Sequence, residues 1–233
     1  MKKTRTLLML HFPTLFCHLI IHANDQAHLK KCLSYLEIKT GKSLAELLPT
    51  NRQKVLVDLL TKFNFSKERI TQALSMCARN DNSFKHSEKK KDTNLLPKHV
   101  VANYVSKGLM AVLSSFVISF SHRDTQTEVK LQIIKSLNDI ILFLKYENLV
   151  SSKNALLDCI KLATNVSKNH LSFEDDVLTL WESFLKTMVS NPESLVGILP
   201  QILCCLLPHL STSPGRTVKI FKFLLQDNIS HYR

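Results

Sequence analysis

The sequence predicts an all-α protein, and three observations support this fold class. Apolar residues recur at intervals of three, four and seven over helix-length segments, most clearly at residues 129–144 and 177–188. Such segments are paired across short polar breaks. Only four glycines occur in 233 residues, and they lie far apart, which disfavours hairpin-rich β folds and phosphate-binding loops. Antiparallel pairs of amphipathic helices stacked along a chain are typical of a HEAT-like α-solenoid.

The N-terminal domain is predicted to consist of HEAT-like helices over residues 1–79. The expected helices cover residues 6–22, 25–39, 51–63 and 67–79. Asn24 is the expected cap of the second helix, which ends near Gly41. Ser43 then begins a short turn that runs into Pro49.

A charged flexible linker is predicted over residues 80–96. Its first fifteen residues, NDNSFKHSEKKKDTN, include one aromatic residue and no aliphatic residue, so the segment cannot bury enough apolar surface to order itself. Lys89, Lys90 and Lys91 fit half of a nuclear import signal. A solvated loop of lysines is the alternative interpretation.

A helical-repeat domain is predicted over residues 97–233. The expected helices cover residues 97–122, 125–145, 152–166, 173–189, 192–210 and 217–228. They form three antiparallel hairpins that start near residues 97, 152 and 192, so the steps are about 55 and 40 residues, and the second step matches a HEAT-type unit.

Two helices of this domain carry further expectations. Ser172 is the expected cap of its helix, and Glu174, Asp175 and Asp176 favour the positive end of the helix dipole. The segment 195–210 is apolar almost all round, so neighbours are expected to cover several of its faces.

The chain is basic, with 31 Lys and Arg against 19 Asp and Glu, a formal net charge of +12. This surplus favours nucleic acid or an acidic protein as a partner without deciding between them. The alternative is a basic solvated surface, since no basic–aromatic motif accompanies the charge.

The six cysteines show no C-x-x-C motif and no disulfide framework. Most occupy apolar helical positions, where a free thiol behaves as a small hydrophobe, and a reducing compartment fits best. Cys204, Cys205 and His209 suggest a metal site only weakly, because adjacent cysteines on a regular helix point in different directions. No metal-ligating residue is therefore predicted.

The N-terminus permits two interpretations. Basic residues precede an apolar run at 7–21, as in a secretory signal. The same residues also fit the stripe of a core helix, and the run is too short to span a bilayer. Sequons at Asn64, Asn165 and Asn228 suit a secreted protein, although such short patterns arise easily by chance.

Motifs for catalysis were sought, and no catalytic or cofactor-binding residue is predicted. His122, Arg123 and Asp124 spell the triplet of a protein-kinase catalytic loop, but Val129 stands where that loop needs its metal-binding asparagine. The triplet is interpreted as a polar turn between two helices. Asp175 and its neighbour Asp176 point about 100° apart on a helix and cannot form an acid–base pair.

The order of four segments resembles the helical-repeat region of the ATR-type checkpoint kinases, which belong to the phosphoinositide-kinase-related protein kinases. HLIIHANDQAHLKKCLSYLEIKTGKSLAELL (18–48) is similar to the helices that precede the UME domain of that family. Residues 99–144 resemble the UME domain itself. LWESFLKTMV (180–189) and LPQILCCLLPHLSTSPGRTVKIFKFLL (199–225) resemble its end and the following repeat.

The resemblance implies a non-catalytic scaffold segment, with a UME-like domain at 97–233, of a nuclear serine/threonine kinase in the DNA-damage and replication-stress checkpoint. It also implies that residues 7–21 form a core helix. The full-length kinase would use ATP with a divalent metal, whereas this chain needs no cofactor. Its partners would be the remaining repeats of the kinase and an adapter subunit, with nucleic acid contacted only indirectly and no membrane. The alternatives are a stand-alone basic helical-repeat protein that binds nucleic acid or an acidic protein, and a small secreted helical protein.

Overall fold

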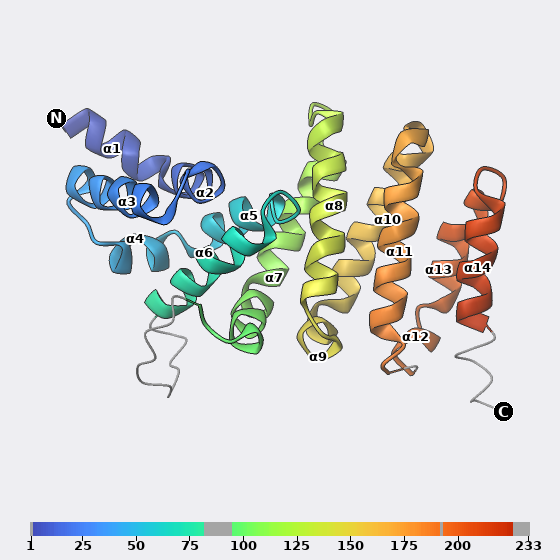
Figure 1. Cartoon of the computed structure of the whole chain (residues 1–233). Helices are drawn as coiled ribbons and strands as arrows, with labels where there is room; N and C mark the ends of the chain where they lie inside the picture. Colours follow the sequence, from blue (N-terminus) through green and yellow to red (C-terminus); the bar gives the residue numbers. More distant parts are fainter. Residues whose placement is uncertain (1, 82–94, 192, 226–233) are drawn as a thin grey trace. The chain divides into compact units, whose positions relative to one another are not determined.

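The computed structural model describes residues 2–81, 95–191 and 193–225, and every regular element in these ranges is helical (Figure 1). The predicted all-α class is therefore confirmed for the described residues. The chain divides into two compact units, Met1–Val112 and Leu113–Arg233. Most of the predicted linker, including Lys89, Lys90 and Lys91, lies outside the described residues.

In its described residues, the first unit contains six complete helices and the start of a seventh. They are α1 (Lys2–Leu10), α2 (Phe12–His22), α3 (Gln26–Thr40), α4 (Leu44–Thr50), α5 (Arg52–Thr61), α6 (Lys67–Asn80) and the N-terminal part of α7 (Lys98–Ser121). Helix α2 packs against α3, α5 and α6. Phe12, Phe16, Cys17 and Ile20 on this helix are buried, so α2 forms the centre of the unit.

The N-terminal segment differs from the single helix expected at 6–22. The chain forms α1 and α2, which are bent by 67° at a break on His11. Pro13 explains the break, because a proline within a helix lacks a hydrogen-bond donor and clashes with the carbonyl four residues earlier. In the first turn of α2 the same proline is well tolerated.

Helix α7 is long and apolar enough to cross a membrane by length and composition, and the bent α1–α2 pair passes the same test if it is counted as one span. Core helices and N-terminal signal sequences satisfy the same criterion. On α7, the apolar side chains of Val101, Val105, Leu109 and Val112 are fully buried.

The caps of α3 and α4 are set by short side chains. Asp25, and not Asn24 as expected, caps α3, because its carboxylate accepts a hydrogen bond of 2.7 Å from the backbone N–H of His28. Gly41 ends α3 in the left-handed conformation, as predicted, with φ of 64°. The expected turn after Ser43 is the short helix α4, whose first turn is closed by a 2.9 Å bond from the Ser43 N–H to the Glu46 carboxylate.

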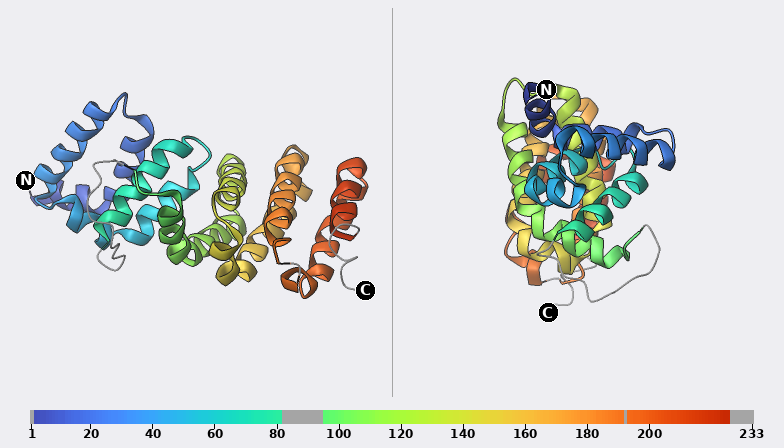
Figure 2. Two further views of the ribbon diagram at one scale, coloured as in Figure 1. Left: turned by 60° about the horizontal axis from the view of Figure 1, so that its bottom comes forward. Right: turned by 90° about the vertical axis from the view of Figure 1, so that its left-hand side faces the viewer.

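The second unit holds the rest of the described chain. Its elements are the end of α7, α8 (Thr127–Phe143), α9 (Tyr146–Leu149), η1 (Val150–Ser152), α10 (Lys153–Asn169), η2 (Leu171–Phe173), α11 (Glu174–Met188), α12 (Glu193–Val196), α13 (Leu199–Leu206), η3 (Leu207–Leu210) and α14 (Pro214–Leu225). Helix α11 packs against α8, α10 and α14, and α8, α11 and α14 lie side by side (Figure 1, Figure 2).

Two expectations for this unit are corrected. Ser172 does not cap α11: it lies in the 3₁₀ turn η2, and α11 begins after Phe173 without a side-chain cap. The helix expected at 192–210 is divided into α12, α13 and η3. Gly197 separates the first two, Pro200 stands in the first turn of α13, and Pro208 in that of η3, as expected where prolines start new turns.

The divided segment is also buried on one face only. Leu195, Ile198, Ile202 and Leu206 are buried. Leu207 is exposed, as are the side chains of Val196 and Cys204. The expected burial of several faces is therefore wrong. Some apolar side chains of this segment remain exposed although its composition predicts that they are buried.

Trp181 lies fully buried at the centre of the α11 stripe, as the sequence predicts for a residue in that position. Its indole N–H donates a 3.0 Å hydrogen bond to Oγ1 of Thr164 on α10, and its ring meets the ring of Phe184 edge-on with centroids 6.1 Å apart. The only polar atom of the Trp181 side chain, the indole nitrogen, therefore has a hydrogen-bond partner in the core.

We expect Trp181→Ala to lower the free energy of unfolding by about 3–5 kcal/mol, because it empties a large aromatic site. Trp181→Phe should cost less, since it keeps most of the apolar volume and loses the bond to Thr164. Urea unfolding followed by circular dichroism measures both. Full quenching of wild-type Trp181 fluorescence by iodide would contradict the burial.

A second packing constraint lies in the first unit, where α7 approaches α5 closely at Gly108. A methyl group at this position would overlap the Cδ1 methyl of Leu56, which is itself buried. We expect Gly108→Ala to destabilise the protein by about 1 kcal/mol, because overpacking of about 1–3 kcal/mol exceeds the helix-propensity gain of about 1 kcal/mol. Gly215→Ala, which meets no atom within 4 Å, is the matched control and should not destabilise.

Candidate functional site

The residues singled out by motif do not assemble into a catalytic site. His122 and Asp124 lie in the turn between α7 and α8, where Nδ1 of the histidine is 3.8 Å from Oδ2 of the aspartate and both side chains are exposed. This placement agrees with a polar turn. Among the described residues, no group of three or more His, Cys, Asp and Glu side chains is positioned to hold a metal ion.

The buried cysteines are held as neutral thiols. Burial raises the pKa of Cys17 to about 11 and that of Cys77 and Cys159 to about 12. Because the thiolate is the nucleophilic form, such thiols are poor nucleophiles. They therefore act as core residues, as the sequence indicates.

A buried polar cluster joins the start of α11 to η3 and α14. Nδ1 of His209 lies 2.8 Å from Oε1 of Glu174, and Thr212 donates a hydrogen bond to the same oxygen. His209 is almost fully buried. Burial raises the pKa of Glu174, but the hydrogen bonds from Thr212 and His209 outweigh it, so the net shift is downward.

Arg216 extends this cluster along the outer side of α11. Its Nε donates a 2.8 Å bond to Glu182, one terminal nitrogen bonds to Thr179 at 2.6 Å, and the other bonds to the backbone oxygen of Asp175 at 3.0 Å. Each nitrogen of the Arg216 guanidinium is thus paired within the protein, whereas Nε2 of the buried His209 has no hydrogen-bond partner among the described residues. Because the cluster connects α11 to η3 and α14, we assign it a structural role.

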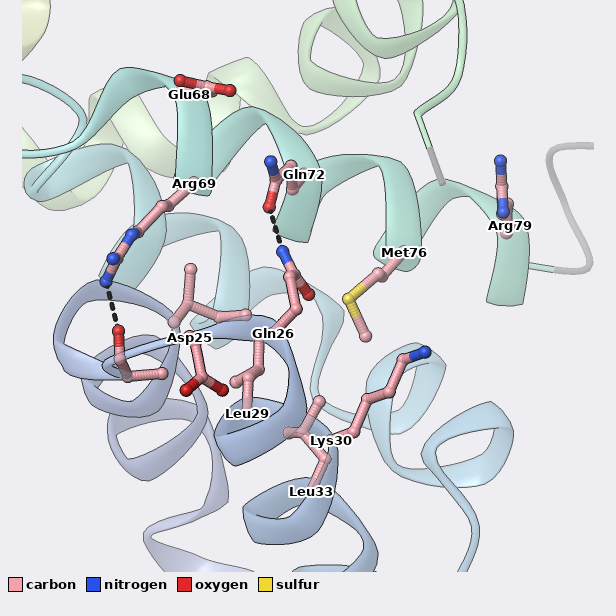
Figure 3. Close-up of a pocket in the computed structure, with 12 residues that line it drawn as sticks. Asp25, Gln26, Leu29, Lys30, Leu33, Glu68, Arg69, Gln72, Met76 and Arg79 are labelled. Carbon is pink, nitrogen blue, oxygen red and sulfur yellow. Dashed lines mark hydrogen bonds between the residues drawn. The ribbon is translucent and has the colours of Figure 1, made fainter. Parts of the chain in front are cut away.

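The candidate binding site is a groove in the first unit, which we call the α3–α6 groove (Figure 3). Its volume is about 350 Å³. Helix α2 packs against both α3 and α6, and residues of these three helices line the groove. The twelve lining residues are Ile20, Ala23, Asp25, Gln26, Leu29, Lys30, Leu33, Glu68, Arg69, Gln72, Met76 and Arg79.

The floor of the groove is aliphatic. Ile20, Leu29 and Leu33 are buried, and the half-buried side chain of Met76 projects from α6 into the groove (Figure 3). A methionine is flexible and polarizable, so it adapts to apolar groups of different shapes. Above the floor, the Gln26 amide donates a 2.8 Å hydrogen bond to the Gln72 side chain across the groove.

The rim carries three basic and two acidic side chains, namely Lys30, Arg69 and Arg79, and Asp25 and Glu68. At one end Asp25 caps α3, and Arg69 donates bonds of 2.9 and 2.6 Å to the carbonyl oxygens of Ile21 and Ala23, where α2 ends. These charges are committed to helix termini. At the other end lie the exposed side chains of Lys30 and Arg79 (Figure 3).

Sequence reasoning did not identify this groove. Its lining comes from residues 20–33 and 68–79, and in each segment the apolar residues read as an ordinary helical stripe. The glutamine pair and the Arg69 bonds join residues more than forty positions apart.

The groove-bearing unit carries nearly all of the net charge. Residues 1–112 contain nineteen Lys and Arg and eight Asp and Glu, so their net charge is 19 − 8 = +11. Residues 113–233 contain twelve and eleven, a net charge of +1. The total of +12 is thus concentrated in one unit.

No protein-family description matches this sequence, and no solved structure matches its fold.

The polar cluster of the second unit makes a testable contribution to stability. Because the pKa of Glu174 is lower in the folded chain than in the unfolded one, its stabilising effect is complete above the ordinary glutamate pKa and is lost as the pH falls through the lowered value. We expect Glu174→Gln to cost about 1.5–3 kcal/mol near neutral pH, the range for hydrogen bonds to a charged group. The difference should shrink at about pH 3.

Urea unfolding of the wild type and the variant at both pH values measures this difference. Glu193→Gln, at an exposed glutamate of α12, is the control and should have little effect at either pH. An equal loss for Glu174→Gln at both pH values would contradict the role given to the ionised carboxylate.

Proposed function

We propose that this chain is a non-catalytic HEAT-like scaffold segment of an ATR-type serine/threonine kinase that acts in the DNA-damage and replication-stress checkpoint. The order of its segments resembles the repeats that precede and include the UME domain. The proposal assigns the chain to the nucleus. It gives the segment a role in shape, partner contact and mechanical linkage, while ATP and metal would bind elsewhere in the full-length kinase.

One observation carries the scaffold role: the repeated spacing of the helices in the second unit. Helices α8, α11 and α14 begin at Thr127, Glu174 and Pro214, which are 47 and 40 residues apart. HEAT and armadillo repeats have periods of about 40–47 residues. The central helix α11 packs against the one before it and the one after it, as expected where each repeat contacts its neighbours. This spacing supports an α-solenoid of antiparallel pairs.

The most direct test of the kinase assignment is the coding sequence beyond Arg233. A kinase catalytic domain in the same reading frame would support the proposal. An in-frame stop codon in the complete transcript would contradict it.

A second candidate function is that of a stand-alone basic helical-repeat protein that binds an acidic protein or nucleic acid. The net charge of +11 on the first unit favours it, because such a charge raises the local concentration of anionic partners. The purified chain separates the two candidates. Under the second, the isolated chain binds its partner by itself, whereas under the first its role depends on the remainder of the kinase.

A pair of substitutions in the full-length kinase tests the scaffold role. Leu137 on α8 is fully buried, so Leu137→Asp places an unpaired charge in the core and should unfold the surrounding helices. Because repeats stabilise their neighbours, kinase output or adapter binding should fall. Asp124→Asn, at an exposed side chain, should be nearly silent.

Kinase assays and adapter co-precipitation measure both variants. Loss of phosphoryl transfer in Asp124→Asn, with the fold intact by circular dichroism, would overturn the scaffold role.

A further inference from the structure

We infer that the outer face of the α13–α14 pair binds an amphipathic α-helix of a protein partner, and that this helix carries an acidic residue beside Lys219 and Lys222. The outer face is the side of the pair that is turned away from α10 and α11. Its apolar residues are Leu199, Leu203 and Leu207 on α13 and η3, and Val218, Phe221 and Leu225 on α14. The inference rests on the proposed stacking of helix pairs and does not need the kinase assignment.

Arg216 shows which side of α14 is the outer one. Its guanidinium bonds to two side chains of α11, so the side of α14 that carries Arg216 faces α11. An α-helix turns by about 100° per residue. Val218, Phe221 and Leu225 therefore lie about 140° to 180° around the helix from Arg216. These three apolar residues form a stripe on the side of α14 opposite to α11.

Helix α13 presents a similar stripe. Nζ of Lys161 on α10 donates a 2.6 Å hydrogen bond to the side chain of Gln201, so Gln201 marks the side of α13 that faces α10. Leu199 and Leu203 are each two residues from Gln201 and therefore lie about 160° from it around the helix. Both are half-buried, and Leu207, which follows in η3, is exposed. Both helices of the pair thus carry apolar side chains away from the preceding pair.

A comparison of α14 with α11 indicates what this face lacks. The two helices begin 40 residues apart, at Glu174 and Pro214. With this offset, Val218 and Leu225 occupy the positions of Leu178 and Leu185. The two leucines of α11 are 0% exposed, whereas Val218 and Leu225 are 40% and 48% exposed. Because α11 has a helix on each side, α8 and α14, the exposed stripe of α14 is the place where a further helix would pack.

The spacing of the stripe suits a helix as the occupant. Val218, Phe221 and Leu225 recur at i, i+3 and i+7, the arrangement by which two amphipathic helices contact each other. The leucines of α13 lie beside them on the same face of the pair. A partner helix with one apolar side can therefore lie along α14, as α14 lies along α11 (Figure 1).

The exposed charges of this pair are mainly basic. In the described residues 193–225 the charged side chains are one carboxylate, Glu193, and three cations, Arg216, Lys219 and Lys222. Arg216 is engaged with α11, and the buried His209 is bonded to Glu174. Two exposed lysines on α14 thus stand against one exposed carboxylate at the start of α12.

The two lysines occupy positions that bind a neighbouring helix in the preceding repeat. With the offset of 40 residues, Lys219 and Lys222 correspond to Thr179 and Glu182, the two side chains of α11 that bond to Arg216. On α14 the charge at these positions is reversed. A partner helix would therefore place a carboxylate where α14 places Arg216, because an arginine there would be repelled.

The same lysines disfavour a second copy of this chain as the occupant. In a two-fold symmetric dimer the same patch of both copies meets. The lysines of one copy would then lie near those of the other, and like charges across an interface repel each other.

The test uses the full chain and a labelled peptide with the sequence of α14, residues 214–225, in which Glu replaces Arg216. A hydrocarbon staple that joins the peptide positions of Val218 and Lys222 keeps it helical and leaves the side with the new Glu unobstructed. Fluorescence anisotropy should show saturable binding. A stapled peptide that retains Arg216, and one with serine in place of Ile220, should bind more weakly.

Two variants of the chain test the charge and the apolar stripe. Lys222→Glu should raise the Kd of the Glu peptide about threefold to fivefold, the scale of an exposed ion pair, and should favour the Arg peptide instead. Lys145→Glu, at an exposed lysine before α9, is the matched control. Leu225→Ser should also weaken binding, whereas Leu142→Ser, at an exposed leucine of α8, should not.

Three outcomes would overturn the inference. The first is the absence of saturable binding by the Glu peptide. The second is an equal effect of Lys222→Glu and Lys145→Glu, which would indicate attraction to net charge alone. The third is a dimer in analytical ultracentrifugation that Leu225→Ser abolishes, which would assign the face to a second copy. The coding sequence beyond Arg233 tests the kinase assignment separately, so either proposal can fail without the other.

Discussion

The second unit depends on the burial of α11 on three sides. Val177, Leu178, Leu180, Trp181 and Phe184 of this helix are all fully buried, which is possible because α8, α10 and α14 each contact it. A helix enclosed in this way cannot leave polar groups without partners, since an unpaired buried group costs about 1–3 kcal/mol. On α11 the Trp181 indole is bonded to Thr164, and Glu174 to Nδ1 of His209; Nε2 of the same histidine is buried without a partner in the described part of the chain.

In the first unit, an arginine provides hydrogen bonds to the end of the central helix, and the packing leaves a groove. Its central helix α2 is short, and α3 and α6 pack against it while they diverge from each other enough to leave a groove. The end of α2 is stabilised by Arg69, which bonds to two of its last carbonyl oxygens. Arg69 therefore acts on the helix terminus, while the exposed side chains of Lys30 and Arg79 lie at the other end of the groove (Figure 3).

The sequence predicts most helices of this chain and few of their boundaries, for a physical reason. Long apolar stripes specify α8 and α11, because burial of many side chains decides whether a helix forms. Boundaries depend on single residues. Asn24 and Asp25 are both suitable N-cap residues, and the structure uses Asp25. Pro13 divides the N-terminal segment into two helices although its apolar pattern is continuous. The groove was not predictable, since it depends on how far α3 and α6 diverge, which neither stripe encodes. The basic charge was visible, but its concentration in one unit follows only from the observed division of the chain.

The range of electrostatic interactions limits what this concentrated charge can do. At physiological ionic strength the Debye length is about 8 Å, so the surplus of the first unit acts mainly on molecules close to that unit's own surface. The second unit, with a net charge of +1, exerts little such attraction. An anionic molecule would therefore be attracted mainly to the first unit, where the α3–α6 groove also offers an aliphatic surface.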